Sequence, residues 1–454
     1  MTINNYAPRE SAPHRIRDDA PGEDQGARLL RAERIAHAIP ALWVRAPALA
    51  QVAAAAAASD PRRAARLADE ARQAALAIRD DMWQVKALGQ AAVAAATGSY
   101  DLASRLADEA EHVISVTSRW KAQYLADLSV MTGGYDPGRS ARLAREAEDA
   151  ANALPDWDQP DALREAAVAQ VTHDPSRAKR LVDRARHYDS LPWTAESHQD
   201  ETLEKMALRV AARDPDLAMA LIGFISADPK RDDARRRVSS ALAPRDTRQA
   251  ERIARTITSR EVMDWALRYV GHAAASHDPY GAERIARTVS SGNTDWHGLA
   301  RVAAAVARTD PGRAVRLADE VENAMNAISA DGRTVEPSTL GWVASAVAAH
   351  DPGRAARLAD QAEQGAQAIV SENDVTGSLT LRSMSEPFDD WDPDRAARIA
   401  TMISVENWRA EALGRIAAAA ARTNPDRAER IARSMTGDPS VPMAKVVEAL
   451  TAGQ

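Results

Sequence analysis

Apolar residues recur along this chain with the spacing of an amphipathic helix. After the dipeptide Asp-Pro at 60–61, Ala64, Leu67, Ala68 and Ala71 stand at positions i, i+3, i+4 and i+7, which share one face of a helix. Aspartate accepts hydrogen bonds from the free N–H groups of a first helical turn, and a proline at the next position has no N–H to lose. The pattern therefore predicts a helix that begins at the proline and buries an alanine-rich face.

The same phrase, Asp-Pro-x-Arg-Ala-x-Arg-Leu/Ile-Ala, recurs through the whole chain. Its second arginine falls at Arg34, Arg66, Arg105, Arg142, Arg180, Arg252, Arg284, Arg316, Arg357, Arg398 and Arg430, and Ala220 takes its place in a twelfth copy. All of these copies follow one another at 32–41 residues. Such a period is the signature of a repeat architecture rather than of three separate domains.

A second helix precedes each of these helices. A leucine stands fifteen residues before the alanine of the phrase in ten of eleven copies, from Leu49 to Leu413, and only Arg235 departs from this rule. The next residue is often small, as at Gly89 and Gly414, so we expect the paired helix to approach closely there. The prediction is an all-α fold, an α-solenoid of about twelve helix-turn-helix repeats of 32–41 residues.

The domain organisation follows from the extent of the repeat. Residues 1–25 are polar and rich in proline, and we expect them to form a disordered leader. Residues 26–454 are expected to form a single continuous helical-repeat domain.

The repeats resemble the tetratricopeptide family. Trp296-x-x-Leu299-Ala300 and the Ala-Leu-Gly triplets at 87–89 and 412–414 look like that family's first helix, and the stretch Gly-Ser-Tyr-Asp-Leu-Ala at 98–103 looks like the entry to its second helix. The units have a longer turn between helices, most lack the first-helix tyrosine, and several exceed the family's period, so HEAT-like repeats are the alternative. Either resemblance implies a concave binding surface and no single activity.

The composition limits the possible functions. The chain of 454 residues is 45% apolar and 27% charged, with a formal charge of −7 and no cysteine. The acidic balance argues against nucleic acid as a partner, and the lack of cysteine excludes disulfides and thiolate metal sites. No apolar run reaches the ~18 residues of a membrane span. We expect a cytoplasmic protein, and 52 arginines against six lysines hint at a bacterial source.

Catalytic and cofactor-binding motifs are scarce. The chain has no dinucleotide-binding glycine motif, phosphate loop or nucleophile elbow, and we interpret the glycine-rich stretch 131–138 as a turn between helices. His173, His277 and His350 each precede Asp-Pro, but other residues take this place elsewhere, so we interpret them as surface residues and expect neither metal nor cofactor. The basic run 230–237 contains two aspartates and is interpreted as a solvated face.

The tryptophans are the most informative residues. There are ten of them against seven tyrosines and two phenylalanines. The resemblance to tetratricopeptide proteins implies ligand-facing places at about −5, −2, +2 and +5 from the first-helix leucine, and these offsets share one stripe of a helix. Five tryptophans occupy such places, namely Trp83, Trp120 and Trp408 at −5, Trp265 at −2 and Trp342 at +2. Trp43 and Trp157 fall near helix starts. The alternative, that tryptophan fills gaps in an alanine-rich core, stays open.

One constellation on this stripe combines aromatic and charged groups. Trp265, Tyr269 and His272 stand at −2, +2 and +5 of one repeat, and His297 and Arg301 at −2 and +2 of the next. Adjacent helices pack roughly 10 Å apart, so these side chains would meet at one concave spot. Rings that stack, a guanidinium and two imidazoles suit an amphipathic ligand with an aromatic or anionic group.

Two stretches depart from the repeat rule, residues 186–245 and residues 371–391. The first has Arg235 in place of the leucine, and the second loses the alanine pattern and contains Pro387 and Phe388. A broken rule is typical either of a functional site or of drift where packing is undemanding, and both interpretations stay open.

Our hypothesis from the sequence is a non-catalytic binding protein that captures a peptide segment or an amphipathic small molecule in a tryptophan-lined concave groove, with a possible role in sequestration or self-protection. The expected contact residues are Trp83, Trp120, Trp265, Tyr269, His272, His297, Arg301, Trp342 and Trp408. The first alternative is an enzyme in the groove that uses His272 and His297 as acid and base. The second is an adaptor or sensor scaffold that binds through the convex face.

Overall fold

The computed structural model describes residues 25–116, 120–188, 192–289, 294–330, 336–369, 375–435 and 437–452. Within these ranges the chain forms 24 α-helices, which pack as consecutive pairs, and a short 3₁₀ helix, η2. The all-α repeat fold predicted from the sequence is thereby confirmed. The leader expected at 1–25 lies, up to residue 24, outside the described residues.

The helices alternate between the two types that the sequence predicts. The even-numbered helices are the first helices of the repeats, and the leucine of the repeat pattern lies on each from α2 to α22 except α12, where Arg235 takes its place: α2 (Leu42–Ala56), α4 (Asp81–Ala96), α6 (Lys121–Thr132), α8 (Gln159–Gln170), α10 (Pro192–Val210), α12 (Asp228–Leu242), α14 (Arg260–Ala274), α16 (Trp296–Val306), α18 (Pro337–Val347), α20 (Val375–Ser385), α22 (Glu406–Ala421) and α24 (Ser440–Thr451). The odd-numbered helices carry the arginine phrase: α1 (Gln25–Ala38), α3 (Pro61–Leu76), α5 (Tyr100–Val116), α7 (Pro137–Asn152), α9 (Pro175–Tyr188), α11 (Pro215–Gly223), α13 (Thr247–Ala254), α15 (Pro279–Thr288), α17 (Pro311–Ala330), α19 (Pro352–Ile369), α21 (Pro393–Thr401) and α23 (Pro425–Arg433). The 3₁₀ helix η2 (Glu386–Phe388) follows α20.

The expected helix starts are confirmed atom by atom. The side chain of Asp60 accepts a hydrogen bond from the backbone N–H of Arg63, and Asp136 accepts one from Arg139 in the same way. Asn424 replaces the aspartate before α23 and makes the same bond. Each cap satisfies one N–H group that the helix itself cannot pair.

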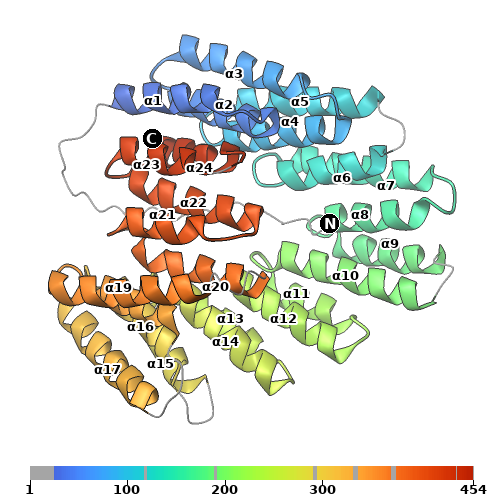
Figure 1. Cartoon of the computed structure of the whole chain (residues 1–454). Coiled ribbons are helices and arrows are strands. Elements are labelled where there is room, and N and C mark those ends of the chain that lie inside the picture. The colour runs from blue at the N-terminus through green and yellow to red at the C-terminus, as the bar shows by residue number, and fades with distance from the viewer. Residues whose placement is uncertain are drawn as a thin grey trace.

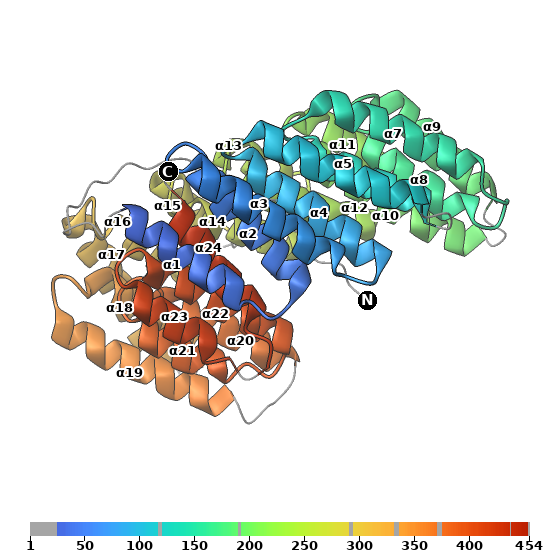
Figure 2. The ribbon, with the colours of Figure 1, turned by 90° about the horizontal axis from the view of Figure 1, so that it is seen from above.

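The solenoid closes into a ring (Figures 1 and 2). The even-numbered helices contact one another in an unbroken series around the molecule, and α24 packs against α2 to complete it. Most odd-numbered helices pack mainly against even-numbered helices. Because the inner layer of a ring follows the shorter circumference, its helices lie closer together. The even-numbered helices therefore form the inner layer and the odd-numbered helices the outer layer.

The ring is closed by a hairpin made from both ends of the chain. Among the described residues, the first helix is the outer helix α1 and the last is the inner helix α24, and these two pack together as a pair. Arg34 of α1 forms an ion pair of 2.8 Å with Glu429 of α23, and the backbone N–H of Ala41 donates to Ser440 Oγ at 3.0 Å. One continuous apolar core runs from Leu29 to Leu450. The last repeat is thus shared between the two ends.

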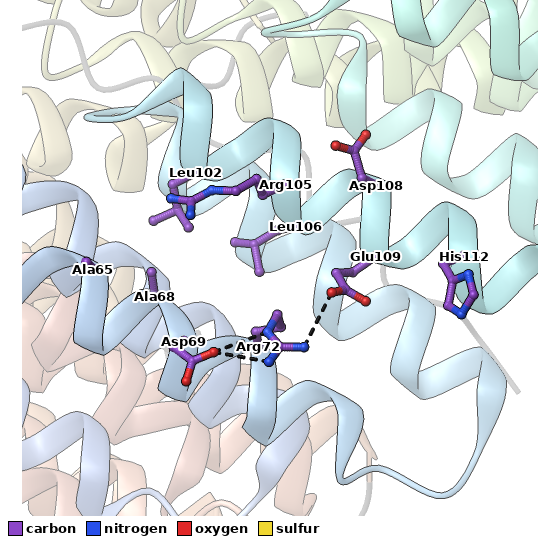
Figure 3. Close-up of a pocket in the computed structure, with 10 residues that line it drawn as sticks. All are labelled: Ala65, Ala68, Asp69, Arg72, Leu102, Arg105, Leu106, Asp108, Glu109 and His112. Atoms are coloured by element: carbon purple, nitrogen blue, oxygen red, sulfur yellow. Dashed lines mark hydrogen bonds and ion pairs between the residues drawn. The ribbon is translucent and has the colours of Figure 1, made fainter.

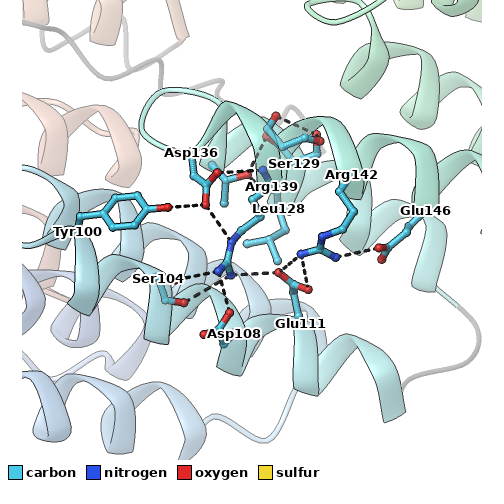
Figure 4. A network of polar contacts seen from close by, with 12 residues as sticks. Tyr100, Ser104, Asp108, Glu111, Leu128, Ser129, Asp136, Arg139, Arg142 and Glu146 are labelled. Atoms are coloured by element: carbon cyan, nitrogen blue, oxygen red, sulfur yellow. Dashed lines mark hydrogen bonds and ion pairs between the residues drawn. The ribbon is translucent and has the colours of Figure 1, made fainter.

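A belt of ion pairs joins the outer helices. In most junctions an arginine of the repeated phrase binds a carboxylate on the outer helix before it. Figure 4 shows this at the junction of α5 and α7, where Arg142 binds Glu111. These pairs are Arg63–Glu33, Arg142–Glu111, Arg177–Glu148, Arg252–Asp216, Arg284–Glu251, Arg313–Glu283, Arg354–Glu322, Arg395–Asp360, Arg398–Glu363 and Arg427–Asp394, with Arg31–Asp426 and Arg34–Glu429 at the closure. The phrase therefore encodes contacts between repeats as well as a helix.

The small residue after the leucine has a different neighbour from the one expected. A Cβ at Gly89 would lie 2.5 Å from Met131 Cε of α6, and one at Gly414 would lie 3.4 Å from Pro442 Cα of α24. Both neighbours belong to the next inner helix and not to the paired outer helix. The small residue sets the spacing of the inner layer, because adjacent inner helices are crowded where the ring is narrowest.

The two irregular stretches have distinct structural causes. In α11, Leu217 and Ala220 replace the two arginines, and the Lys179 ammonium lies 4.6 Å from the centroid of the Phe224 ring instead. In the second stretch the described residues contain η2, whose Phe388 is fully buried. Residues 371–374 of that stretch lie outside the described residues.

Candidate functional site

Exposed tryptophans mark the starts of four consecutive inner helices. Trp43, Trp83, Trp120 and Trp157 stand at or just before the first turn of α2, α4, α6 and α8, and their exposed fractions are 39%, 42%, 51% and 81%. Alternate helices of a hairpin solenoid run parallel, so these four ends lie on one rim of the ring. We call this set the tryptophan row.

The first two members of the tryptophan row touch each other. The ring centroids of Trp43 and Trp83 are 5.5 Å apart, and the Lys86 ammonium lies 5.5 Å from the Trp83 ring. A tilted indole pair with a cation over one face offers a ligand an apolar surface beside a positive charge. The sequence placed Trp43 only near a helix start. Its contact with Trp83 shows that Trp43 belongs to the same surface.

A carboxylate lies on the inner helix that follows. Burial and the charge of Glu165 raise the pKa of Asp127 to about 6. Lys205 on α10 lies 3.6 Å from Glu165, and Glu165 raises the pKa of that ammonium against the opposing effect of its burial. The inner face beside the tryptophan row therefore carries mixed charge.

A second aromatic group lies on α14. The centroids of Trp265 and Tyr269 are 5.7 Å apart, and both rings are exposed. The guanidinium of Arg236 on the preceding inner helix stacks over Trp265 at 4.2 Å. Arg236 belongs to the basic run 230–237, whose arginines are paired, as in the 2.7 Å contact between Arg236 and Asp233. The run is therefore an ion-paired face and not an open basic patch.

The expected histidine pair is formed. The rings of His272 on α14 and His297 on α16 have centroids 4.9 Å apart. His272 Nε2 lies 3.2 Å from Asp295 Oδ2, and Asp295 also caps α16 through the backbone N–H of Gly298. Burial opposes the charge of Asp295, but the bond and the charge of His272 bring the pKa of this carboxyl below its ordinary value.

His297 is neutral at physiological pH. Burial, aided by the charges of His272 and Arg301, lowers the pKa of His297 far below its ordinary value. Its Nδ1 lies 3.2 Å from the hydroxyls of both Ser338 and Thr339 on α18. The Ser338 hydroxyl donates to Glu336 Oε1 at 2.6 Å, so towards Nδ1 it can only accept, whereas the Thr339 hydroxyl can donate to this nitrogen. Either bond lets the next repeat orient the ring.

Arg301 is already engaged by two groups from later repeats. Its guanidinium stacks 4.4 Å from the Trp342 ring and forms an ion pair of 2.9 Å with Glu386. Glu386 comes from η2, in the stretch where the repeat rule breaks. Burial opposes the charge of Glu386, but Arg301 and Arg415 lower the pKa of this carboxyl below its ordinary value. The irregular element therefore supplies the partner of Arg301.

The nine expected contact residues fall into three groups. Trp83 and Trp120 belong to the tryptophan row. The residues Trp265, Tyr269, His272, His297, Arg301 and Trp342 occupy three consecutive inner helices, α14, α16 and α18. Trp408 on α22 is separate and half-buried against the core, and Trp342 is half-buried as well.

Sequence reasoning missed several polar partners in this region. Asp295, Ser338 and Glu386 contact the expected residues from positions outside the stripe. Asp295 had one signal, because an aspartate just before Trp296 is a typical helix cap. Glu386 lies 85 residues from Arg301, and no local pattern indicates such a pair.

The histidines before Asp-Pro were interpreted as surface residues, and His277 is exposed as expected, whereas His173 is half-buried. His173 Nε2 lies 2.9 Å from Ser140 Oγ, and His277 Nε2 lies 3.3 Å from Thr247 Oγ1. Each hydroxyl belongs to the outer helix of the preceding repeat, so these histidines bridge repeats. His350 is exposed. Among the described residues, no group of three or more histidine, aspartate or glutamate side chains could hold a metal ion.

A separate groove lies on the outer face between α3 and α5 (Figure 3). It encloses about 620 Å³ and is lined by Ala68, Arg72, Leu102, Arg105 and residues around them. Leu102 stands where α3 and α7 have Arg63 and Arg139, so this junction lacks one guanidinium of the belt. The groove is shallow and its rim is crossed by the Arg72–Glu109 contact of 3.3 Å.

Comparison with known proteins leaves the family open. No protein-family model and no curated protein matches the chain. Two solved structures are similar at low TM-score: Ton1535 from Thermococcus onnurineus NA1, with TM-score 0.29 and 14% identity over 85% of this chain and 96% of that one, and a circular tandem repeat protein with novel repeat topology and enhanced subunit contact surfaces, with TM-score 0.26 and 15% identity over 93% and 98%. At these scores neither likeness bears on function.

The fold and the site define the class of the molecule. It is an all-α helical-repeat protein whose ends share one hairpin. Among the described residues, no helix combines the length and the apolar character that crossing a bilayer requires.

Proposed function

We propose that this ring is a non-catalytic binding protein that captures an extended amphipathic ligand on the tryptophan row. The ligand we propose is a peptide segment. The observation that carries the proposal is the exposure of Trp43, Trp83, Trp120 and Trp157 at four successive helix starts. Exposed clusters of large apolar side chains are typical of interaction sites. Tryptophan is also among the residues that contribute most to binding energy.

The charges beside the row indicate the character of the ligand. Lys86 stands over Trp83, and its ammonium can receive a carboxylate of the ligand while the indole covers an apolar group. The row crosses helices that are spaced by roughly 10 Å, which a peptide spans more readily than a compact small molecule. An amphipathic small molecule is the alternative ligand, and it would use fewer members of the row.

The proposal is tested by selecting ligands from a random peptide display library on the purified full chain. Trp83→Ala and Trp120→Ala are each expected to weaken the selected peptides about tenfold, the loss of about 1.4 kcal/mol expected for one interface anchor. The matched control is Trp408→Ala, which removes a half-buried indole outside the row and leaves affinity unchanged. Selection of no peptide, or of peptides that ignore both row variants, would contradict the proposal.

A second candidate function is an enzyme in the inner face around His272 and His297. The observation that favours it is the Asp295–His272 pair beside a neutral imidazole, an arrangement in which one ring can hold a proton that the other accepts. Separate His272→Asn and His297→Asn variants decide between the two functions. A large loss of turnover at retained ligand affinity would overturn the binding-only proposal.

The finer assignments belong to the same proposal. The repeats are of tetratricopeptide type, supported by the small residue after the leucine that sets the inner-helix spacing, with HEAT-like repeats as the alternative. The protein acts in the cytoplasm, as the lack of cysteine favours. The remaining alternative is an adaptor that binds its partner through the charged outer face. In that case Trp83→Ala would not change the affinity for the partner.

A further inference from the structure

Two arginines and a histidine gather at the rim opposite the tryptophan row, and none of the three has a carboxylate partner among the described residues. Arg209 ends α10, Arg213 follows in the next turn, and His173 lies in the turn between α8 and α9. Elsewhere most arginines of this chain are held in ion pairs. Among the residues that the structure describes, neither Arg209 nor Arg213 makes an ion pair or a side-chain hydrogen bond.

Three turns converge on this point. A Cβ at Gly133, in the turn between α6 and α7, would lie 3.6 Å from Arg209 Nη2 and 3.3 Å from Ser140 Oγ. Arg209 therefore reaches from α10 across α8 to the turn two repeats earlier. His173 Nε2 lies 2.9 Å from Ser140 Oγ, and that hydroxyl donates to the carbonyl of Ser129 at 2.7 Å. The imidazole therefore donates to Ser140, which fixes its orientation.

The cluster lacks a compensating anion. Arg209 Nε is buried without a hydrogen-bond partner, and so is Nε2 of Gln170, one turn before His173. Burial and the neighbouring charge of Arg213 lower the pKa of Arg209 to about 10. Burial, Arg209 and Arg213 lower the pKa of His173 as well, and no carboxylate opposes them. A buried charge without a partner is strongly unfavourable.

We propose that Arg209 and Arg213 form a binding site for a tetrahedral oxyanion, a phosphate group, at the rim where the α6–α7, α8–α9 and α10–α11 turns meet. Guanidinium groups bind phosphate oxygens through paired, charge-assisted hydrogen bonds. The missing side chain at Gly133 leaves the Nη2 edge of Arg209 uncovered, and His173 borders the site. The glycine-rich turn that the sequence indicated only as a connection thus becomes one wall of a site.

Arg209 differs from another partly buried arginine, Arg139, in its lack of carboxylate partners within the described part of the chain. At Arg139, three carboxylates from two helices surround one guanidinium, namely Asp108, Glu111 and Asp136. Arg209 is half-buried, its Nε atom is fully buried, and it has no carboxylate partner among the described residues. A structural arginine would be paired as Arg139 is, so the unpaired state indicates a ligand that supplies the negative charge.

The test is thermal unfolding of the full chain in inorganic phosphate and in chloride at equal ionic strength. We expect phosphate to raise the Tm of the native chain specifically. Arg209→Met is expected to be at least as stable as the native chain in chloride, because it removes an uncompensated charge, and to lose the response to phosphate. Arg139→Met is the matched control, expected to lose stability in both buffers and to keep the response.

Two further experiments test the site with a variant that is not expected to disturb the fold and identify the source of the phosphate group. Arg213→Gln changes an exposed residue and is expected to weaken phosphate binding about tenfold in calorimetric titration. Tighter binding of phosphoserine than of inorganic phosphate would assign the site to a phosphorylated ligand, and the reverse to the free ion. Equal Tm in phosphate and chloride, or an Arg209→Met variant that is destabilised in chloride yet still responds to phosphate, would overturn the proposal.

Discussion

The buried histidine at the inner face shows how a single residue links the site to stability. His297 is held by the hydroxyls of Ser338 and Thr339 and stays neutral because burial opposes its charge. In the unfolded chain a histidine has a pKa of about 6.5. Between the two pKa values the unfolded state therefore binds more protons than the folded state, and the folded state loses stability as the pH falls.

His297→Asn isolates this effect. Between pH 7.5 and pH 5 the native chain should lose about 2 kcal/mol through His297, since the slope approaches about 1.4 kcal/mol per pH unit below pH 6.5. The variant should lack this part of the pH dependence. Urea unfolding at the two pH values measures the difference, and identical pH profiles for both chains would show that folding does not lower the pKa of His297.

The arginines of the belt differ widely in how much each contributes to the free energy of unfolding. The Arg139 side chain is 11% exposed and contacts three carboxylates, whereas Arg252 is 65% exposed and has one contact of 3.4 Å to Asp216. Arg139→Met should cost about 2 kcal/mol, because it removes the contacts of a largely buried guanidinium with three carboxylates, two of which are themselves mostly buried. Arg252→Met should cost less than about 0.5 kcal/mol, as is usual for exposed pairs. Chemical denaturation measures both, and equal losses would contradict the assigned roles.

At the scale of helices, the turns decide how closely the inner layer packs. Gly98, between α4 and α5, lies against the C-terminal end of α2, and a Cβ there would overlap the carbonyl group of Ala54, whose carbon would be 2.7 Å away. A backbone cannot move aside as a flexible side chain can. Gly134, in the equivalent turn after α6, has nothing within 4 Å of a Cβ.

These two glycines make a matched pair of substitutions. Gly98→Ala should destabilise the fold by about 2 kcal/mol, because α2 and α4 must separate. Gly134→Ala should change stability by less than about 0.5 kcal/mol, since its neighbourhood is open. Thermal unfolding of both variants checks the difference. Equal effects would mean that α2 and α4 are not in contact through this turn.

The elements that the sequence predicted best are those with local causes. The helix after Asp60 begins where its cap and proline place it, because those contacts lie within one turn. The partner of Arg301 could not be predicted, because Glu386 comes from a distant 3₁₀ turn that interrupts the repeat. Arg209 and Gly133 are also far apart in the sequence, and their proximity depends on the stacking of three repeats.

At the scale of the molecule, the repeat pattern did not predict whether the solenoid closes into a ring. Among the described residues, the first helix, α1, carries an arginine phrase, and the last helix, α24, belongs to the inner layer. Whether these two meet depends on small rotations added over all the repeats, and no single residue encodes that sum. The ion pair Arg34–Glu429 and the bond from Ala41 to Ser440 show that they do meet.

Closure can be measured in solution. The chain has no cysteine, so Arg34→Cys/Glu429→Cys accepts two spin labels and no others. Double electron–electron resonance should give one narrow distribution at the short end of its range. A broad or long distribution would mean that the ring opens between α1 and α23.

The binding surface itself is tested most directly by the indole N–H signals of the ¹⁵N-tryptophan-labelled full chain. A peptide selected on the native protein should shift the signals of Trp43, Trp83, Trp120 and Trp157 and leave that of the half-buried Trp408 in place. Assignment by single Trp→Phe variants identifies each signal. Shifts confined to tryptophans outside the row, or no shift at a saturating concentration, would contradict the account.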